Sequence, residues 1–188
     1  MKYLKILLIL LLLCGCAKQE EAEPEETGED PIPAYFLSLP EQPSDEDEIF
    51  VCANDGLHKE ELWDDFMDEV ADQRECDITI GRYTIEGDVI YELLVHDGNG
   101  FVLYTDNSRD RFGISEGITE ESRKFLYDLS YLTIEEINDT KKPFVNRYVF
   151  MSDEDLKDEE EVKAYLDEVS AGKESDMVMI WAMQQPAE

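Results

Sequence analysis

Apolar and polar residues alternate through residues 78–113, the stretch around which we expect the fold to be organised. Ile78 and Ile80 flank the polar Thr79, which is the two-residue period of a β-strand. Turn-forming residues at 86–88 and 97–100 divide the stretch into strands at residues 78–83, 89–96 and 101–105. The pattern therefore predicts an antiparallel meander, followed by a polar loop at residues 106–113.

A second pattern, with helical spacing, covers residues 58–73. The apolar positions that make its inner stripe are Leu62, Trp63, Phe66, Met67 and Val70. The other face carries Glu60, Glu61, Asp64, Asp65, Asp68 and Glu69, and we interpret these acids as a solvated helix face. A short buried strand at residues 49–52 precedes this helix, and residues 54–56 form a turn or a helix cap.

The region after the meander is predicted to be partly helical. Thr119 is placed to cap a helix over residues 120–129. Residues 132–140 are ambiguous, although Thr133 and Glu136 have capping-box spacing, which favours a short helical turn. Pro143 is expected to mark a break before a strand at residues 145–151.

An internal repeat relates the two ends of the expected domain. Adding 99 to the numbering takes Leu57 to Leu156, Glu60 and Glu61 to Glu159 and Glu160, and Asp68 and Glu69 to Asp167 and Glu168, without a gap. We interpret residues 49–83 and 148–182 as two copies of a strand–helix–strand unit. Residues 89–146 have no counterpart.

These patterns predict one α+β domain. We expect it to cover residues 49–183, with a mainly antiparallel sheet, two or three helices packed on one face, and a short tail at residues 184–188.

The N-terminus has the layout of a secretion signal. Lys2 and Lys5 precede an apolar run at residues 6–13, which is far shorter than the ~20 residues of a membrane-spanning helix. The run ends in Leu13, Cys14, Gly15 and Cys16, and this sequence resembles the lipobox of bacterial lipoproteins. The resemblance implies that residues 1–15 are removed and that Cys16 carries a diacylglyceryl and fatty acyl (palmitate-type) anchor. The alternative is an ordinary soluble secreted protein.

Residues 16–48 are expected to be a disordered tether. They are rich in Asp and Glu and are interrupted by prolines, so they cannot bury enough apolar surface to fold alone. Residues 34–39 are an apolar interruption, which we expect to pack on the protein's own domain. The predicted location is the extracytoplasmic face of a cell membrane.

Charge narrows the range of partners. The 188-residue chain has 47 Asp and Glu against 16 Lys and Arg, a formal net charge of −31. Such a charge repels nucleic acid and favours a soluble monomer. Cys52 and Cys76 would lie at opposite edges if their strands run parallel, so we favour two buried free thiols, although an oxidising location permits a disulfide.

The sequence around the meander also resembles a known family. Residues 82–90, RYTIEGDVI, and residues 104–113, YTDNSRDRFG, resemble an uncharacterised small domain of lipoproteins from Gram-positive bacteria, domain of unknown function 4362. The similarity covers about residues 55–151. It supports the predicted location and the extent of the domain, and it implies no activity.

The 106–113 loop is the first candidate for chemistry. Asp106, Ser108 and Asp110 have the spacing of the first ligands of a calcium loop. However, Arg111 stands where such a loop needs glycine, and Gly117 stands where it needs an acid. Asp–Arg pairs, with Arg109 included, and hydrogen bonds that close the loop are the favoured interpretation.

A carboxylate pair is the second candidate. Glu86 and Asp88 flank Gly87 and could act together, as in glycoside hydrolysis, but turn chemistry is the favoured interpretation. His58 and His96 fit no metal or nucleophile motif, and no cofactor is expected.

The predicted function is a surface-anchored module that binds a protein or a small ligand through the meander and its loop. An envelope hydrolase and a calcium-binding surface protein are the alternatives.

Overall fold

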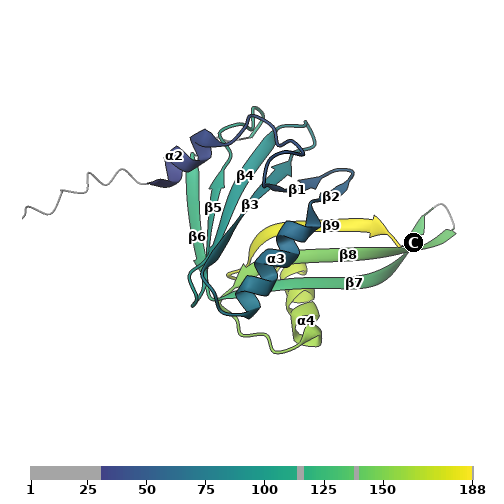
Figure 1. Ribbon diagram of the computed structural model, residues 1–188. Coiled ribbons are helices and arrows are strands. Elements are labelled where there is room, and N and C mark those ends of the chain that lie inside the picture. The colour runs from purple at the N-terminus through teal and green to yellow at the C-terminus, as the bar shows by residue number, and fades with distance from the viewer. Residues whose placement is uncertain (1–30, 114–116, 138–139, 188) are drawn as a thin grey trace, which may run out of the picture. The chain divides into compact units, whose positions relative to one another are not determined.

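The computed structural model describes residues 31–113, 117–137 and 140–187. The predicted signal, Cys16 and the first half of the predicted tether lie outside these residues. Within them, the strands form a six-stranded sheet, sheet A, and a three-stranded sheet, sheet B (Figure 1). The predicted α+β class is confirmed, with three helices and mostly antiparallel pairing in the described residues. The strands, however, divide into two sheets where one was expected.

Sheet A has the strand order β2-β1-β3-β4-β5-β6. Its strands are β1 (Phe50–Ala53), β2 (Gly56–His58), β3 (Cys76–Tyr83), β4 (Val89–His96), β5 (Phe101–Asp106) and β6 (Ile118–Arg123). The predicted meander is β3, β4 and β5, and β1 runs parallel to β3 through helix α3 (Glu60–Ala71). The turn at residues 54–55 closes the β1–β2 hairpin, so it does not cap α3.

Sheet B consists of β7 (Phe125–Ile137), β8 (Thr140–Ser152) and β9 (Val178–Pro186), all antiparallel. The helix predicted at residues 120–129 is wrong, because these residues belong to β6 and β7. The predicted helical turn after Leu132 is also strand, and Thr133 accepts a side-chain hydrogen bond from Asn146 across the β7–β8 hairpin (2.7 Å). Pro143 lies inside β8 and pairs with Ile134.

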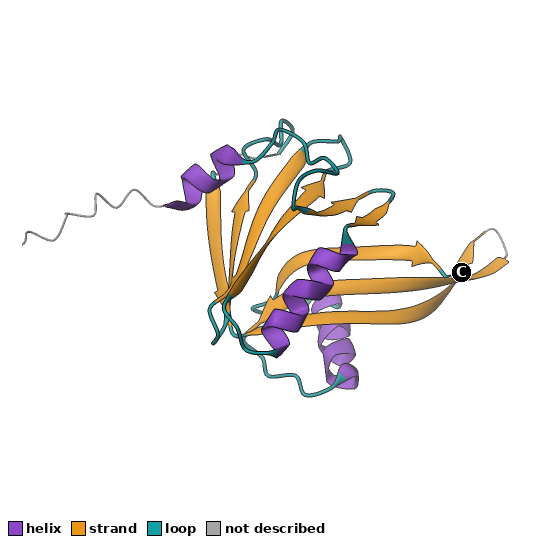
Figure 2. Cartoon of the chain, viewed as in Figure 1, coloured by secondary structure: helices purple, strands orange, loops and turns teal. Residues whose placement is uncertain are grey.

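The helices lie on different faces, contrary to the single face expected. Helix α3 packs between the two sheets, and helix α4 (Glu159–Ser170) packs on the opposite face of sheet B (Figure 2). Successive residues of β8 show why: Val149 faces the α3 core, whereas Phe150 faces the α4 core.

Helix α2 (Pro31–Ser38) covers the face of sheet A opposite α3. Phe36 is buried there against Tyr91 and Leu93, which confirms that the apolar interruption packs on its own domain. The chain beyond α2 stays close to the sheet, because Tyr91 Oη donates a hydrogen bond to Pro40 O (2.9 Å). Residues 31–48 therefore differ from the extended tether that their composition predicts.

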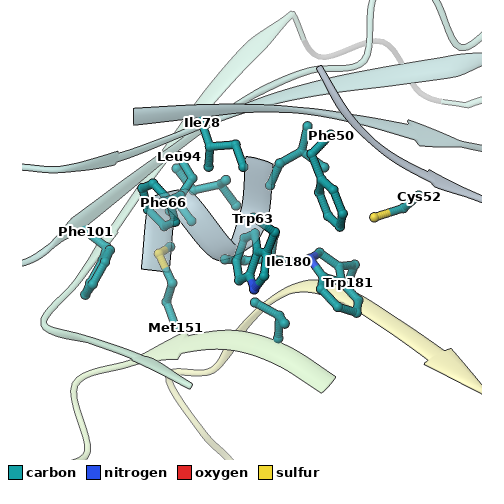
Figure 3. Close-up of a cluster of buried hydrophobic side chains, with 13 residues drawn as sticks. Phe50, Cys52, Trp63, Phe66, Ile78, Leu94, Phe101, Met151, Ile180 and Trp181 are labelled. Carbon is teal, nitrogen blue, oxygen red and sulfur yellow. The ribbon is translucent and has the colours of Figure 1, made fainter. Parts of the chain in front are cut away.

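The core between the sheets is aromatic. Trp63 of α3 is 1% exposed, and Figure 3 shows its ring among those of Phe50, Phe66 and Trp181, with centroids 5.7, 5.7 and 5.8 Å away. Cys52 is buried beside this cluster, Cys76 is partly buried, and both are free thiols. Truncating Trp63 to alanine would cost about 3–5 kcal/mol, since the cavity could not close.

The element order of the repeat recurs, but its pairing does not. Helices α3 and α4 begin and end at positions that differ by 99 residues. Strands β1 and β3 are parallel, whereas β8 and β9 are antiparallel. The two units therefore share the strand–helix–strand order, although β2 has no counterpart in the second unit, and they differ in topology.

Candidate functional site

The turn between β3 and β4 holds an aspartate that reaches the polar loop. Asp88 is 6% exposed, and its Oδ2 accepts a hydrogen bond from Arg111 N (3.0 Å). Its Oδ1 accepts from Arg111 Nε (2.9 Å) and also from Nη2, so that two nitrogens of the guanidinium bind the carboxylate. The turn itself is closed by Thr84 N donating to Asp88 O (2.8 Å), with Gly87 at a φ of 87° that favours glycine.

This pairing keeps Asp88 ionised. The hydrogen bonds from the Arg111 side chain, followed by the one from its main chain, lower the pKa of Asp88 below its usual value. Asp88 in turn raises the pKa of Arg111. An ionised, fully bonded carboxylate is not a general acid, since that role needs a raised pKa.

A second Asp–Arg pair ties the loop to helix α2. Asp106 Oδ1 accepts from Ser108 N (2.9 Å), and Oδ2 accepts from Arg109 Nη1 (2.8 Å). Arg109 Nη2 donates to Phe36 O (2.9 Å) and Leu39 O (3.2 Å), which are carbonyls at the end of α2. Carbonyls at the C-terminal end of a helix have no hydrogen-bond donor within the helix, and here the Arg109 guanidinium is a donor to them.

Arg109 also stacks on the sheet. Its guanidinium carbon lies 4.8 Å from the centroid of the Tyr91 ring, a cation–π geometry. Burial raises the pKa of Tyr91 to about 12, so the phenol stays neutral beneath the cation. Arg109 therefore joins β4, the loop and α2.

Asp110 closes the far end of the loop. Its Oδ1 accepts from Phe112 N (3.0 Å) and Gly113 N (2.9 Å). A side chain at Gly113 would collide with this carboxylate. The loop-closing hydrogen bonds and Asp–Arg pairs predicted from the sequence are thus present.

The calcium interpretation gains nothing from this geometry. Asp106 and Asp110 each direct oxygens to main-chain amides of their own loop, and Ser108 contributes its main-chain N–H. Within the described residues, no group of three or more His, Cys, Asp or Glu side chains is placed to hold a metal ion.

An open hollow of about 360 Å³ lies beside the two pairs. Its lining residues are Glu41, Gln42, Asp88, Val89, Ser108, Arg109 and Arg111. The structure therefore brings together Asp88, Ser108 and Arg109 of the predicted residues. Glu86 is exposed on the turn and is not among the lining residues, so the predicted Glu86–Asp88 catalytic pair has no common site.

Two buried or partly buried polar groups were not predicted. Glu92 of β4 is 2% exposed and accepts from Arg82 Nη2 (2.9 Å) through Oε1. Glu92 Oε2 and Arg82 Nε have no hydrogen-bond partner among the described residues. Burial raises the pKa of Glu92, and Arg82 opposes that rise. A lone acid inside the apolar run of residues 89–96 is the signal that could have revealed it.

The other group, which is partly buried, lies between α3 and sheet B. Arg147 donates from Nε and Nη2 to the two oxygens of Asp128 (2.9 and 2.6 Å), and Trp63 Nε1 donates to Asp128 Oδ2 (2.9 Å). The Arg147 guanidinium lies 5.1 Å from the Trp181 ring centroid. A cavity of about 170 Å³ adjoins Arg147. These groups hold α3 on sheet B.

Comparison with protein families identifies the central part of the chain. Residues 47–142 match the model of the family described as Domain of unknown function (DUF4362). The chain belongs to this family. The match covers β1 to β7, ends inside β8, and leaves α2, α4 and β9 outside the DUF4362 region. It includes Asp88, Arg109 and Arg111, whereas the α2 carbonyls that Arg109 binds lie outside it. No curated protein and no solved structure gives a match.

No helix among residues 31–113, 117–137 and 140–187 is both long and apolar enough to cross a bilayer.

Proposed function

We propose that this DUF4362 protein is a membrane-anchored extracytoplasmic lipoprotein that acts as a binding or interaction module. Its contact surface is the 106–113 loop with the adjoining hollow, and its anchor is the lipid on Cys16. The lipobox-like residues 13–16 and the acidic segment that follows them support the anchored location.

The observation that carries the binding proposal is the double Asp–Arg frame. Asp88 with Arg111 and Asp106 with Arg109 fix a polar loop in one conformation beside an open hollow. A loop that is ordered before its partner arrives avoids the entropic cost of ordering during binding. The same bonds occupy Asp88 and Asp106, and Glu86 is not among the residues that line the hollow, which favours binding over catalysis by a carboxylate pair.

Three residues that line the hollow have polar side chains that a partner can contact. Glu41, Gln42 and Ser108 are exposed lining residues whose side chains make none of the loop-closing bonds described above. A ligand can therefore contact them without breaking the frame. Polar contacts of this kind fix orientation and specificity in binding sites.

Site-specific photocrosslinking in intact cells tests the contact surface. A photoreactive amino acid replaces Ser108 at the rim in one variant and Glu61 on the outer face of α3 in a matched control. We expect a discrete adduct from position 108 that disappears when Glu41 and Gln42 are both changed to alanine. Equal adducts from both positions, or none from position 108, would contradict the proposed surface.

Labelling with an alkyne fatty acid tests the anchor separately. The wild-type chain should take up the label and stay with membranes, and the Cys16→Ser variant should do neither. Label in the variant, or an unlabelled wild-type chain in the soluble fraction, would overturn the anchored location without affecting the binding proposal.

A further inference from the structure

Strand β7 is a free edge of sheet B. It runs over 13 residues, and its sheet partner among the described strands is β8 alone. In an antiparallel pair, alternate N–H and C=O groups point away from the partner, so the outer edge of β7 offers a row of unpaired main-chain groups.

Up to Ile134, the edge has few of the charges that usually block strand addition, and the exposed Glu135 and Glu136 come only at the end of β7. Asp128 is the one charged residue among residues 125–134. Its carboxylate turns inward and is neutralised by Arg147. By contrast, β6, one of the two edge strands of sheet A, exposes Glu120 and Glu121 in the middle of the strand. Exposed charges on an edge strand oppose pairing with another chain.

A groove runs along this edge. It has a volume of about 420 Å³ and is lined by residues 127–130 of β7 on one side. The residues 156–159 and Val162, at the start of α4, line the other side. The second wall lies outside the DUF4362 match, so the groove combines the family domain with the segment that follows it.

Hydrogen bonds hold the second wall in place. Tyr127 Oη donates to Glu154 O (2.7 Å) and accepts from Leu156 N (2.9 Å). Asp158 caps α4 by accepting from Glu161 N (3.0 Å). The groove is therefore a formed feature of the fold and needs no rearrangement before an extended segment enters.

The surroundings of the groove indicate the side chains that would fit. Further along β7, Leu132 and Ile134 are 62% and 68% exposed and alternate on the face of sheet B that carries α3. On the α4 side, the charged lining residues are Asp158, Glu159 and Lys157, and Lys157 is paired with Asp155. A strand laid beside β7 would place alternate residues on these two faces, apolar ones beside Leu132 and Ile134 and basic ones beside the acids.

Charge also decides between a foreign segment and a second copy. Two copies would each bring a net charge of −31 and would place the acids of their grooves together. Like charges across an interface are unfavourable, whereas a cationic segment is attracted. A basic partner is therefore favoured over self-pairing.

We propose that β7 receives an extended segment of a partner protein, in which basic and apolar residues alternate, as a fourth strand of sheet B. This surface is distinct from the 106–113 loop and does not depend on the function proposed for it. Residues 127–134 of β7 would contact the segment along eight positions.

The probe is an eight-residue peptide of alternating Lys and Val, added to the full-length chain in neutral detergent. Two isomers carry N-methyl groups either on every Lys or on every Val. The N–H groups of successive residues point to opposite edges of a strand. One isomer therefore keeps the N–H donors that face β7, and the other isomer loses them. We expect the parent and one isomer to bind alike and the other isomer to bind at least about tenfold more weakly.

Two charge reversals in the first turn of α4 provide a matched pair. Glu159→Lys reverses the charge of a residue that lines the groove. Glu160→Lys makes the same reversal at the next residue, which is not among the lining residues. We expect about threefold to tenfold weaker binding for Glu159→Lys and less than about a twofold change for Glu160→Lys.

Hydrogen exchange of β7 amides locates the peptide. Slower exchange within residues 127–134 upon peptide addition supports the proposal. Equal binding of both N-methylated isomers, or equal binding of a Lys–Ser peptide of the same charge, means general cationic attraction and overturns it. Concentration-dependent dimers with protected β7 amides in the absence of peptide would instead make a second copy the occupant and also overturn it.

Discussion

Asp88 accepts hydrogen bonds from both the main chain and the guanidinium of Arg111, which follows it by 23 residues. This pair connects the β3–β4 turn to the loop after β5. Together with Asp106 and Arg109, it turns a stretch of exposed polar residues into an ordered surface.

The Asp88–Arg111 pair should make stability depend on pH. The folded-state pKa of Asp88 is lowered, so its stabilisation is complete above the unfolded carboxyl pKa of about 3.9 and is lost as pH falls through the folded-state pKa. We expect the melting temperature of Asp88→Asn to fall less than that of the wild type between neutral pH and about pH 3. Glu86→Gln, on the same turn, is the control and should follow the wild type. Parallel curves for all three proteins would refute the role given to the pair.

Arg109 should hold helix α2 on sheet A. Arg109→Ala removes bonds to Phe36 O of α2, to Leu39 O just after α2 and to Asp106, and we expect a loss of about 2–4 kcal/mol in the free energy of unfolding by urea. Amides of α2 should exchange faster in this variant. Arg111→Ala is the control, because Arg111 contacts Asp88 and not α2, and its α2 amides should keep wild-type rates. Unchanged α2 exchange in Arg109→Ala would show that Phe36 packing alone retains the helix.

The two partners of the Arg82–Glu92 pair should differ in mutational cost. The Arg82 side chain is 38% exposed and can turn to water, whereas that of Glu92 is 3% exposed and cannot. Removing the partner of a buried charge costs about 3–5 kcal/mol, so we expect a loss of this size for Arg82→Met and a smaller one for Glu92→Met. Equilibrium unfolding of both variants measures the difference.

The same pair has a pH signature. The pKa of Glu92 is raised, so a Glu92 carboxylate left without Arg82 takes up a proton as pH falls and the penalty in Arg82→Met should shrink. The penalty in Glu92→Met should not shrink in this way. A larger cost for Glu92→Met at neutral pH would contradict this description of the pair.

Cys52 should resist thiol reagents in the folded protein. Burial, with a contribution from Glu92, raises the pKa of its thiol to about 12, so the reactive thiolate is scarce at neutral pH. In a chain carrying Cys14→Ser, Cys16→Ser and Cys76→Ser, we expect labelling by a maleimide only after denaturant is added. Rapid labelling of this variant without denaturant would show that the β1 region opens readily.

The elements predicted correctly from the sequence are those with a regular pattern of apolar residues or with clear turn residues at their ends. Alternation located β3, the turn residues at 86–88 and 97–100 delimited β4 and β5, and the stripe containing Trp63 and Phe66 located α3. Strand β7 was mistaken for helix because both of its faces are used. Leu126 packs toward α3 and Leu129 toward α4, so the apolar residues show no two-residue alternation. A strand that packs against a helix on each face has apolar residues on both faces, so a search for apolar–polar alternation does not find it.

The candidate site was predicted in part for a similar reason. Asp–Arg pairing in the 106–113 loop follows from local spacing, and both the Asx-type bonds and Arg109 were found that way. The partners Phe36 and Tyr91 come from distant elements, and the choice of Asp88 for Arg111 depends on strand register. Contacts between residues so far apart in the chain cannot be predicted from the spacing of neighbouring residues.

Amide hydrogen exchange of the 106–113 loop shows whether the two Asp–Arg pairs order this loop without metal or ligand, as a preformed contact surface. In metal-free buffer we therefore predict slowed exchange at the amides of Ser108, Arg111 and Gly113, each of which donates to an aspartate carboxylate. Adding millimolar Ca²⁺ should change neither these rates nor the melting temperature. Exchange at the rate of an unstructured chain, or protection that arises only with Ca²⁺, would contradict the account.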